Sequence, residues 1–318
     1  DESTVDAAWE HALATGLIRH QDRPLLVSPI GEGSQAELIQ YLFRRQLGDG
    51  VLPIVGSAND VNLALRLAIY RYTEDGGIDT EYRSIQNFRF AIEAALLAQP
   101  KLTPKSPRCY LSGPGYIWMD YIDGQVFDDD MAEALNELPR ETITTLLTEC
   151  VESVEPLMKH GIGHGDLKFG NFMFTWDGGV RLIDFGLARF FGERTEFDMT
   201  RITGTPWYSA PEVEEGRAHR KSDMYSLGAV FFKLLKQIST KKKGSIDGLE
   251  AAEAAKQGML LMHPNDRWDV DRVLHTLRNA LTEPLRDPQS EERRRILKDL
   301  AEKILEIQER RRKFQTGE

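Results

Sequence analysis

The chain has 318 residues, of which 41% are hydrophobic and 28% are charged, and its formal net charge is −10. These values predict a globular protein with one large domain or two lobes, and the acidic balance argues against nucleic acid as the main partner. The two cysteines, Cys109 and Cys150, lie far apart and indicate neither a disulfide framework nor a cysteine metal site. No apolar run reaches the length of a membrane span and the acidic start lacks a signal-peptide pattern, so we expect an intracellular protein, cytoplasmic or nuclear, without membrane insertion.

Residues 1–40 are predicted to form an N-terminal extension. Apolar residues at helical spacing around Trp9 predict a short helix, which either packs on the main body or binds a partner. Further along, Ser34 and Glu37 match a capping box, which we interpret as the start of a second helix. The segment Gly31-Glu32-Gly33 could instead cradle a phosphate, but a single Gly-x-Gly pattern is a weak signal.

A second glycine pair, Gly48 and Gly50, is followed by a predicted strand that ends at Val55 and by turn residues at Asn59-Asp60. Residues 61–69 then alternate with a period of two, which predicts a strand with two distinct faces. A strand, a glycine loop, a strand, a tight turn and another strand would form a hairpin that covers ATP. An ordinary β-hairpin is the alternative, because a proline stands where such loops usually have a third glycine.

The rest of the chain is predicted to contain a helix, two strands and then mainly helices. Apolar residues at helical spacing mark residues 80–99, and two short strands follow between residues 110 and 122. An amphipathic stripe covers residues 143–158, and the apolar segment Ser222–Ile238 suits a helix buried inside a domain. From Ser290 we expect a charged helix that docks onto the main body.

Most candidate catalytic residues lie between His164 and Asn171, in the sequence His-Gly-Asp-Leu-Lys-Phe-Gly-Asn. The carboxylate of Asp166 stands two positions before Lys168 and five before the amide of Asn171. Further on, Asp184 adds a second acid in the sequence Asp-Phe-Gly. A base, a cation and two oxygen ligands for a hard metal ion, this close together, are what phosphoryl transfer requires.

With Gly204–Glu212, Ser222–Gly228 and Arg267, these motifs resemble a eukaryotic-type protein kinase of the Ser/Thr branch over roughly residues 41–282. The resemblance implies an α+β, bilobal protein-kinase fold that uses ATP and Mg²⁺ to phosphorylate Ser or Thr of a protein substrate. It divides the chain into an N-terminal extension 1–40, a β-rich small lobe 41–123 with one main helix, a mainly helical large lobe 124–286 and a charged C-terminal helix 287–318. Either terminal segment could bind a partner or dock onto the chain itself.

The resemblance assigns a role to each residue of this cluster. Asp166 would accept or orient the proton of the substrate hydroxyl, and Lys168 would neutralise charge on the transferring phosphoryl group. Thr205 would hydrogen-bond both residues and help to seat the acceptor. Asn171 and Asp184 would hold Mg²⁺, a hard cation that prefers oxygen ligands.

Three further residues are implied to be structural, and two positions depart from the family. Glu212 and Arg267 resemble the buried ion pair under the activation segment, and Asp223 resembles the acid that anchors the catalytic loop. Gly165 stands where many kinases have an arginine that receives the activation-loop phosphate. Gly170 replaces a glutamate, which removes one acid that kinases use to select basic substrates.

The nucleotide contacts are carried over in the same way. Val55 and Met173 match the aliphatic residues that sandwich adenine. Met119 matches the gatekeeper, and Tyr121 lies in the hinge. Glu93 fits the glutamate of the small-lobe helix, while the second glycine pair would cover the phosphates.

The family also places a lysine on the third strand, where it pairs with the helix glutamate and touches the nucleotide phosphates, but residues 1–100 contain no lysine. An alignment without gaps puts Tyr70 in this position. A reversal at the predicted turn puts Arg66 there instead, with Ala64 against the adenine and opposite Val55, and the turn residues and the alternation favour this register. A planar guanidinium does not replace a compact ammonium at a tight phosphate site.

Three functions are compatible with this pattern. The first is an active Ser/Thr protein kinase, which the complete catalytic loop favours. The second is a pseudokinase or an inactivated kinase that acts as a nucleotide-binding scaffold or regulator, which the missing lysine favours. The third is a small-molecule phosphotransferase with a His-Gly-Asp loop, but Thr203–Glu212 would build a platform for an extended peptide and argues against it.

Overall fold

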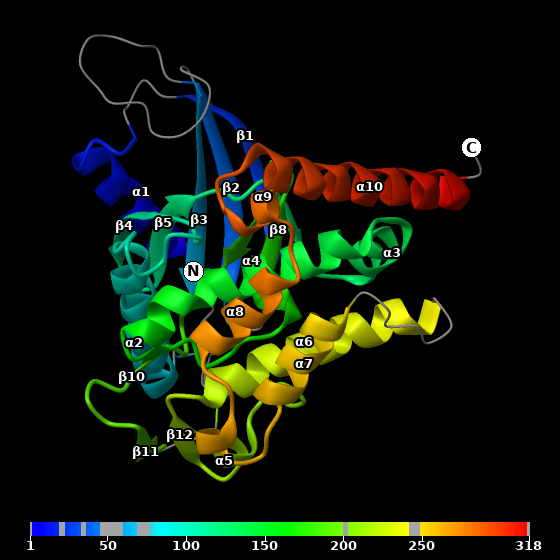
Figure 1. Cartoon of the computed structure of the whole chain (residues 1–318). Coiled ribbons are helices and arrows are strands. Elements are labelled where there is room, and N and C mark those ends of the chain that lie inside the picture. The colour runs from blue at the N-terminus through cyan, green and yellow to red at the C-terminus, as the bar shows by residue number, and fades with distance from the viewer. Residues whose placement is uncertain are drawn as a thin grey trace. The chain divides into compact units, whose positions relative to one another are not determined.

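Figure 1 shows the computed structural model of the chain, which describes residues 2–18, 23–32, 36–44, 60–68, 77, 79–199, 203–241 and 249–316. The chain forms two compact units. The first comprises Asp1–Pro100 and Pro107–Ile122, and the second comprises Lys101–Ser106 and Asp123–Glu318. Among the described residues, no helix is both long enough and apolar enough to cross a bilayer.

In the described part of the first unit, five antiparallel strands form one sheet in the order β1-β2-β3-β5-β4. The strands are β1 (Arg23–Glu32), β2 (Ala36–Arg44), β3 (Asp60–Ala68), β4 (Cys109–Gly113) and β5 (Tyr116–Asp120). The predicted period-two strand is confirmed as β3. Its Leu63, Leu65 and Leu67 belong to one buried apolar cluster, whereas Arg66 pairs with Glu93.

The N-terminal helix α1 (Glu2–Ala14) packs on the face of the sheet that carries these leucines. The Trp118 Nε1 group of β5 donates to the backbone carbonyl of Ala8 at 3.0 Å, and the rings of Trp9 and Trp118 lie 6.0 Å apart. The helix predicted around Trp9 therefore exists and docks on the chain itself.

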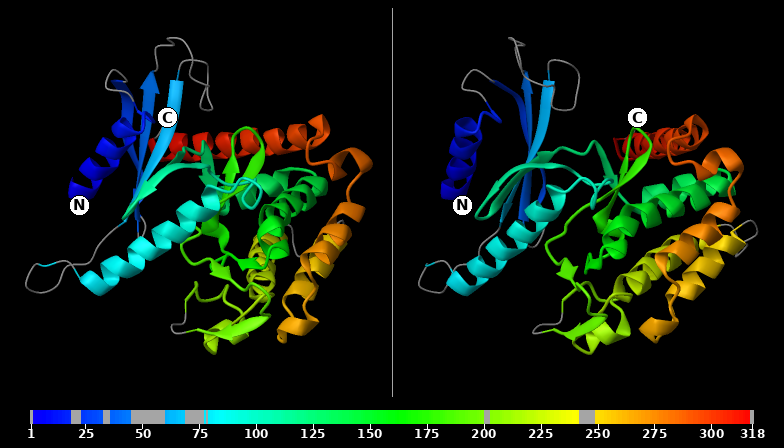
Figure 2. Two further views of the ribbon diagram at one scale, coloured as in Figure 1. Left: turned by 90° about the vertical axis from the view of Figure 1, so that its left-hand side faces the viewer. Right: turned by 60° about the vertical axis from the view of Figure 1, so that its left-hand side comes forward.

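The helix α2 (Thr80–Leu97) contacts the sheet through the side chain of Glu93, which pairs with Arg66 of β3. Its start is fixed by Asp79, whose carboxylate accepts from the backbone N–H of Tyr82. Figure 2 shows α1 and α2 on either side of the sheet. The alternation along β3 is thus explained by two helices that cover opposite faces.

The prediction of a helix that begins at Ser34 is wrong, because residues 36–44 form strand β2. This strand pairs with β1 on one side and with β3 on the other. In the sheet, this segment forms backbone hydrogen bonds with two neighbouring strands. These non-local bonds outweigh the local preference for a helix that the capping pattern indicates. The hairpin that precedes β3 is therefore made of β1 and β2, with Glu32 opposite Glu37 at its end.

The described part of the second unit is mainly helical. Its helices are α3 (Asp129–Glu137), α4 (Arg140–Lys159), α5 (Pro211–Glu214), α6 (Ser222–Lys241), α7 (Glu250–Met259), α8 (Val270–Asn279), α9 (Glu283–Arg286) and α10 (Glu291–Thr316), with the 3₁₀ turns η1 (Phe169–Asn171) and η2 (Pro264–Asp266). Its short strands are β6 (Gly124–Val126), β7 (Ile162–Gly163), β8 (Phe172–Thr175), β9 (Gly179–Leu182), β10 (Arg189–Phe190), β11 (Glu196–Asp198) and β12 (Arg217–His219). They pair as β6-β8-β9, β7-β10 and β11-β12.

The two long helices predicted from apolar periodicity are confirmed as α4 and α6. On α4, Ile143, Leu147 and Cys150 are fully buried. Gly161 follows the end of the helix with φ +68°, a left-handed conformation that glycine adopts without strain. Both helices therefore belong to the core of the second unit.

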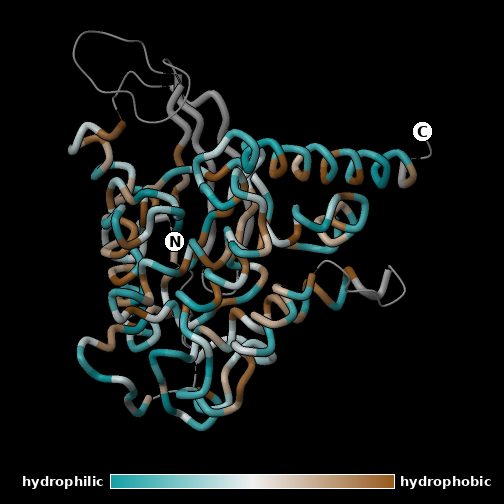
Figure 3. Tube along the Cα trace, in the orientation of Figure 1, coloured by the Kyte–Doolittle hydropathy of each residue, from teal (hydrophilic) through white to brown (hydrophobic). Residues whose placement is uncertain are grey.

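The C-terminal helix α10 docks onto α3 and α4 of the same unit. Its apolar residues Leu297, Leu300, Ile304 and Ile307 are buried, and Figure 3 shows hydrophobic positions recurring along this otherwise hydrophilic helix. The predicted charged helix that docks on the main body is thus present, and its charged side chains lie mostly on the exposed face.

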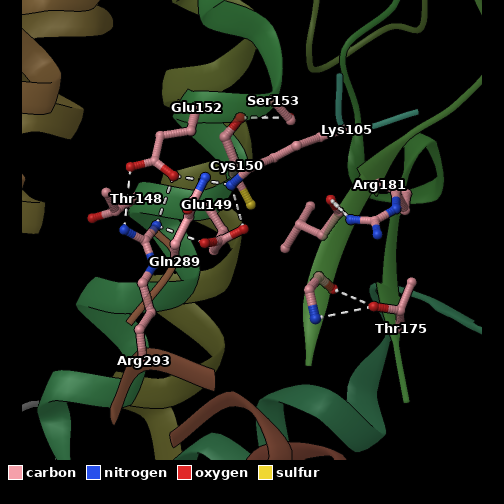
Figure 4. A network of polar contacts seen from close by, with 12 residues as sticks. Lys105, Thr148, Glu149, Cys150, Glu152, Ser153, Thr175, Arg181, Gln289 and Arg293 are labelled. Atoms are coloured by element: carbon pink, nitrogen blue, oxygen red, sulfur yellow. Dashed lines mark hydrogen bonds and ion pairs between the residues drawn. The ribbon is translucent and has the colours of Figure 1, made fainter. Parts of the chain in front are cut away.

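A buried ionic cluster ties α10 to α4 (Figure 4). The carboxylate of Glu152 accepts from both Nη atoms of Arg293, at 3.2 and 2.8 Å, and from Lys105 at 2.9 Å. Glu149 pairs with the same two cations, at 2.5 Å to Lys105 and 2.6 Å to Arg293. Arg278 of α8 adds a third cation at 2.9 Å from Glu152. Two acids thus face three cations at the junction of three helices.

Candidate active site

The loop that carries the predicted base is anchored from the start of α6. Both carboxylate oxygens of Asp223 accept backbone N–H groups of this loop, that of His164 at 2.5 Å and that of Gly165 at 3.1 Å. The His164 ring is buried, lies 5.0 Å from the ring of Phe185 and contacts the carbonyl of Ile183 at 3.1 Å. The anchoring role predicted for Asp223 is therefore confirmed as a contact.

Asp166, Lys168 and Thr205 form a closed triangle of polar contacts. The Thr205 hydroxyl donates to Asp166 Oδ1 at 2.7 Å, and Lys168 Nζ donates to Asp166 Oδ2 at 2.7 Å. Lys168 Nζ also donates to Thr205 Oγ1 at 3.1 Å. The two donors fix the direction of the Asp166 carboxylate. An anionic base beside a cation is what acceptance of a hydroxyl proton and stabilisation of a phosphoryl group require.

Of the two predicted metal ligands, Asn171 is hydrogen-bonded to Asp166 of this triangle. Asn171 Nδ2 donates to the backbone carbonyl of Asp166 at 2.7 Å, so the amide oxygen is the atom of this side chain that could act as the predicted metal ligand. The Asn171 carbonyl accepts the N–H of Ile183 at 3.0 Å, so Asp184 follows a residue that is bonded to Asn171. Asp184 itself has φ +66°, an uncommon conformation outside glycine that is typical of functional sites.

This donor set suits Mg²⁺ bound together with a nucleotide. One amide oxygen and one carboxylate are hard ligands, but they fill only part of an octahedral shell. In the part of the chain that the structure describes, no group of three or more His, Cys, Asp or Glu side chains could hold a metal ion. Mg²⁺ commonly binds through one or two protein ligands and completes its shell with phosphate oxygens and water.

Sequence reasoning missed Arg189, a cation beside Gly165. Gly165 has φ +83°, and a Cβ atom there would lie 2.3 Å from the carbonyl oxygen of Leu187 and 3.3 Å from Arg189 Nη1. The Arg189 Nη2 group donates to the hydroxyl of Thr203 at 2.5 Å, and burial lowers the pKa of this guanidinium. The only sequence signal was its place five residues after Asp184, which does not reveal that β10 pairs with β7 next to the loop.

The segment that follows the triangle rests on the predicted buried ion pair. Arg267 donates to both Glu212 oxygens, at 2.6 and 2.7 Å, and is 1% exposed. Its remaining N–H groups donate to backbone carbonyls, and the Ser222 hydroxyl donates to Glu212 at 2.7 Å. Burial opposes ionisation, but these donors outweigh it and lower the pKa of Glu212. The pair therefore fixes a platform on which Trp207 is fully solvent-facing at 93% exposure.

In the first unit, the predicted pairing of the third-strand cation with the helix glutamate is present. Arg66 Nε lies 3.4 Å from Glu93 Oε2, and the Arg66 guanidinium lies 5.6 Å from the centre of the Phe90 ring. Ala64 is paired with Met119 across β3 and β5, and both side chains are buried. Sheet register thus brings together the adenine contact and the gatekeeper that were predicted separately.

The predicted hairpin partner of β3 is wrong. Gln40 of β2 lies opposite Ala64, and Leu38 lies opposite Arg66. The predicted contacts Gly48, Gly50 and Val55, together with the alternative residue Tyr70, lie outside the described residues. The error arose because the neighbour of a strand is determined by pairing with distant segments. The turn residues Asn59-Asp60 carry no information about such pairing.

Two further residues, Tyr121 and Met173, were predicted to contact the nucleotide. Tyr121 follows directly on β5 in the first unit and is half-buried. Met173 lies in β8 of the second unit, opposite Val126 and Arg181, and is also half-buried.

Comparison with known proteins decides the family. The model of the protein kinase domain matches residues 109–314, which include the whole Asp166 site and its platform. The chain belongs to the protein kinase family. The predicted α+β bilobal kinase fold of the eukaryotic type is therefore confirmed.

Relatives of this kinase domain are serine/threonine-protein kinases. A probable serine/threonine-protein kinase of Streptomyces coelicolor is 29% identical over 59% of the chain and 29% of the relative. PknJ of Mycobacterium tuberculosis is 28% identical over 61% of the chain and 33% of the relative. Serine/threonine-protein kinase 36 of Mus musculus is 33% identical over 36% of the chain and 9% of the relative. The chain thus spans a third or less of the length of these curated relatives.

The family match begins at Cys109, at the first residue of β4. It therefore leaves out β1 to β3 and α2, the part of the kinase domain in which the lysine is missing. The match includes the whole segment from His164 to Asn171.

Proposed function

We propose that this kinase domain transfers the γ-phosphoryl group of ATP to Ser or Thr of protein substrates. The observation that carries the proposal is the triangle of Asp166, Lys168 and Thr205, which holds the carboxyl group, the amine and the hydroxyl within hydrogen-bond distance of one another. A scaffold protein has no need of such a geometry. The relatives named as serine/threonine-protein kinases support the same reaction class.

In the proposed mechanism, the substrate hydroxyl approaches Asp166, whose carboxylate orients it and accepts its proton. Thr205 keeps this carboxylate in place and lies beside the acceptor. Lys168 neutralises charge that develops on the transferring group. Asn171 and Asp184 would hold Mg²⁺, which when bound supplies positive charge to the nucleotide phosphates. Substrate entry onto the platform around Trp207 would present an extended peptide to the base.

For the nucleotide, we assign the phosphate-covering loop to the β1–β2 hairpin. Its sequence runs Gly31-Glu32-Gly33-Ser34-Gln35-Ala36, with an alanine where such loops often have a third glycine. The strand that follows this hairpin pairs with β3, which carries Ala64 and Arg66. The assignment replaces the one to Gly48 and Gly50.

A second candidate function is a nucleotide-binding scaffold, and the observation that favours it is Arg66. This guanidinium pairs with Glu93, and we assign it to the position of the missing lysine. It retains the positive charge but is larger and planar, so it cannot approach the α- and β-phosphates as an ammonium does. A domain with this substitution could bind ATP and transfer its phosphoryl group poorly.

Turnover of Mg²⁺-ATP, measured on the chain and on its Arg66→Lys variant with Ser/Thr peptides, separates the two functions. We expect measurable transfer by the chain itself and an increase in kcat/KM of about tenfold in Arg66→Lys, because the shorter ammonium keeps the pair with Glu93 and frees space for the phosphates. Arg66→Met serves as the control and should lower the activity. If neither the chain nor Arg66→Lys transfers phosphate while both bind ATP, the scaffold is correct.

A further inference from the structure

The acceptor side of the site carries a cation that the proposed mechanism does not use. Lys233 lies on α6, and its Nζ is 4.6 Å from the centre of the Phe169 ring and 5.9 Å from the centre of the Tyr208 ring. Phe169 directly follows Lys168, and the N–H of Tyr208 donates to the carbonyl of Thr205 at 3.2 Å. The ammonium therefore lies between the two segments that hold the base and its hydroxyl partner.

The rings of Phe169 and Tyr208 hold this ammonium in place without neutralising its charge. Phe169 is buried and packs against Phe127, with ring centres 5.9 Å apart, so its position is set by the core. An aromatic face attracts a cation through its quadrupole, but it does not neutralise the cation as a carboxylate would. The Lys233 side chain is exposed to solvent. A positive charge is thus held at a defined place and stays open to a ligand.

No described carboxylate forms an ion pair with this ammonium. The three acids at the start of α3 are engaged elsewhere: Asp128 caps the helix, Asp129 accepts from Gln237 of α6 at 2.7 Å, and Asp130 pairs with Arg311 of α10. These three acids are therefore engaged in contacts within the domain and not with Lys233.

The catalytic loop leaves open space at Gly170, directly after Phe169. A Cβ atom at Gly170 would meet no heavy atom within 4 Å, and its φ is not in the left-handed region. The position that lacks an acid is therefore open to solvent. The preceding residue, Phe169, contacts the Lys233 ammonium, so a substrate side chain that enters beside Gly170 comes close to that ammonium.

We propose that Lys233 forms a subsite for an acidic side chain of the substrate, an Asp or Glu close to the acceptor Ser or Thr. This inference rests on the proposed function, because it names the substrate class of the same site. An ion pair formed at the rim of a binding site contributes more to selection between partners than to affinity. The kinase domain should accordingly select acidic sequences, although the net charge of −10 of the whole chain disfavours acidic partners at long range.

The test uses three peptides with the same acceptor Ser, flanked by acidic, neutral or basic residues. For the unmodified chain, we expect kcat/KM to be about fivefold higher for the acidic than for the neutral peptide, the size of one exposed ion pair. Lys233→Met should abolish this preference and Lys233→Glu should reverse it. Lys298→Glu, the same charge change on the exposed face of α10, is the matched control and should keep the preference.

A second pair of variants isolates the charge at Gly170 without touching Lys233. Gly170→Glu should lower the preference for the acidic peptide, because the new carboxylate competes for the ammonium, while the isosteric Gly170→Gln should retain it. Equal effects of the two substitutions would show that bulk, not charge, matters there, and would overturn the subsite.

Peptide binding, measured by fluorescence anisotropy with labelled peptides, keeps the inference separate from the proposed function. Tighter binding of the acidic than of the basic peptide, lost in Lys233→Met, supports the subsite even if no peptide is phosphorylated, in which case only the proposed transfer fails. Equal binding of the acidic and basic peptides to the unmodified chain overturns the subsite, whatever the turnover.

Discussion

Asp166→Asn is expected to lower kcat for peptide phosphorylation by about 10²- to 10⁴-fold, the range of a general base, with little change in the KM for ATP. An asparagine has nearly the same shape, so Thr205 can still donate to its carbonyl oxygen at position Oδ1. The amide cannot accept a proton, and Lys168 loses the charge to which it now donates at 2.7 Å. The chemical step is therefore lost while the fold is kept.

The matched control is Asp177→Asn, the same substitution at an exposed acid of the β8–β9 turn. It should leave kcat unchanged, and both variants should unfold at the temperature of the parent chain. A kcat of Asp166→Asn above one tenth of the parental value would contradict the assignment of the base.

The catalytic loop could be predicted from the sequence because its parts are close together along the chain. Asp166, Lys168 and Asn171 stand within six residues, and their mutual contacts follow from one turn of backbone and its 3₁₀ continuation η1. The contact with Thr205, 39 residues away, required the resemblance to a family. The local spacing alone would have predicted the residues of the loop but not their contact with Thr205.

The strand that pairs with β3 could not be predicted from local signals, because two segments ahead of β3 each contain a glycine pair. Gly31-Glu32-Gly33 and the pair of Gly48 and Gly50 both combine Gly-x-Gly with flanking apolar residues. What separates them is which strand pairs with β3, and this depends on hydrogen bonds between distant segments. The strand β3 itself was predicted correctly, and its Arg66 pairs with Glu93.

The docking of the two terminal helices was predicted only in outline. Trp118 contacts Ala8 across 110 residues, and Arg293 contacts Glu152 across 141 residues. A sequence pattern predicts which face of such a helix is buried, but it does not predict the surface against which that face packs. The ionic cluster beneath α10 is therefore a finding of the structure, and its energetic weight can be measured.

Glu152→Ala is expected to lower the free energy of unfolding by about 3–5 kcal/mol, the cost of removing one partner from a buried ionic cluster. Glu152 is 6% exposed and accepts from three cations, Lys105, Arg278 and Arg293. Its loss leaves these cations with Glu149 as the one remaining acid of the cluster. Urea or thermal unfolding followed by circular dichroism measures the difference.

The matched control is Glu155→Ala, the same substitution one turn further along α4. Glu155 pairs with Lys159 at 2.6 Å in an exposed i,i+4 contact. Such a surface pair contributes at most about 1 kcal/mol, so this variant should remain close to the parent chain. Equal destabilisation by the two substitutions would show that the helix position, and not the buried cluster, determines the effect.

The effect of Glu152→Ala should also depend on pH. Burial opposes ionisation of Glu152, but Lys105 and Arg293 outweigh it and hold the pKa of this carboxyl below its ordinary value of 4.5. A carboxyl group whose pKa falls on folding stabilises the folded state above its unfolded pKa, and this stabilisation is lost as the pH falls through the folded pKa. The difference between parent and variant should therefore be full near neutral pH and shrink below about pH 4.5.

A double variant separates the charge balance of the cluster from the packing of α10. Arg293→Met alone should also destabilise the domain, because Glu149 and Glu152 each lose a cation. Combined with Glu152→Met, it removes one charge of each sign and places two apolar side chains at the junction, an exchange that buried ion pairs often tolerate. The double variant should thus be more stable than the sum of the two single effects predicts, by about 0.5–3 kcal/mol. Strict additivity would mean that the two side chains stabilise the helix junction independently, contrary to the contacts at 2.8 and 3.2 Å between them.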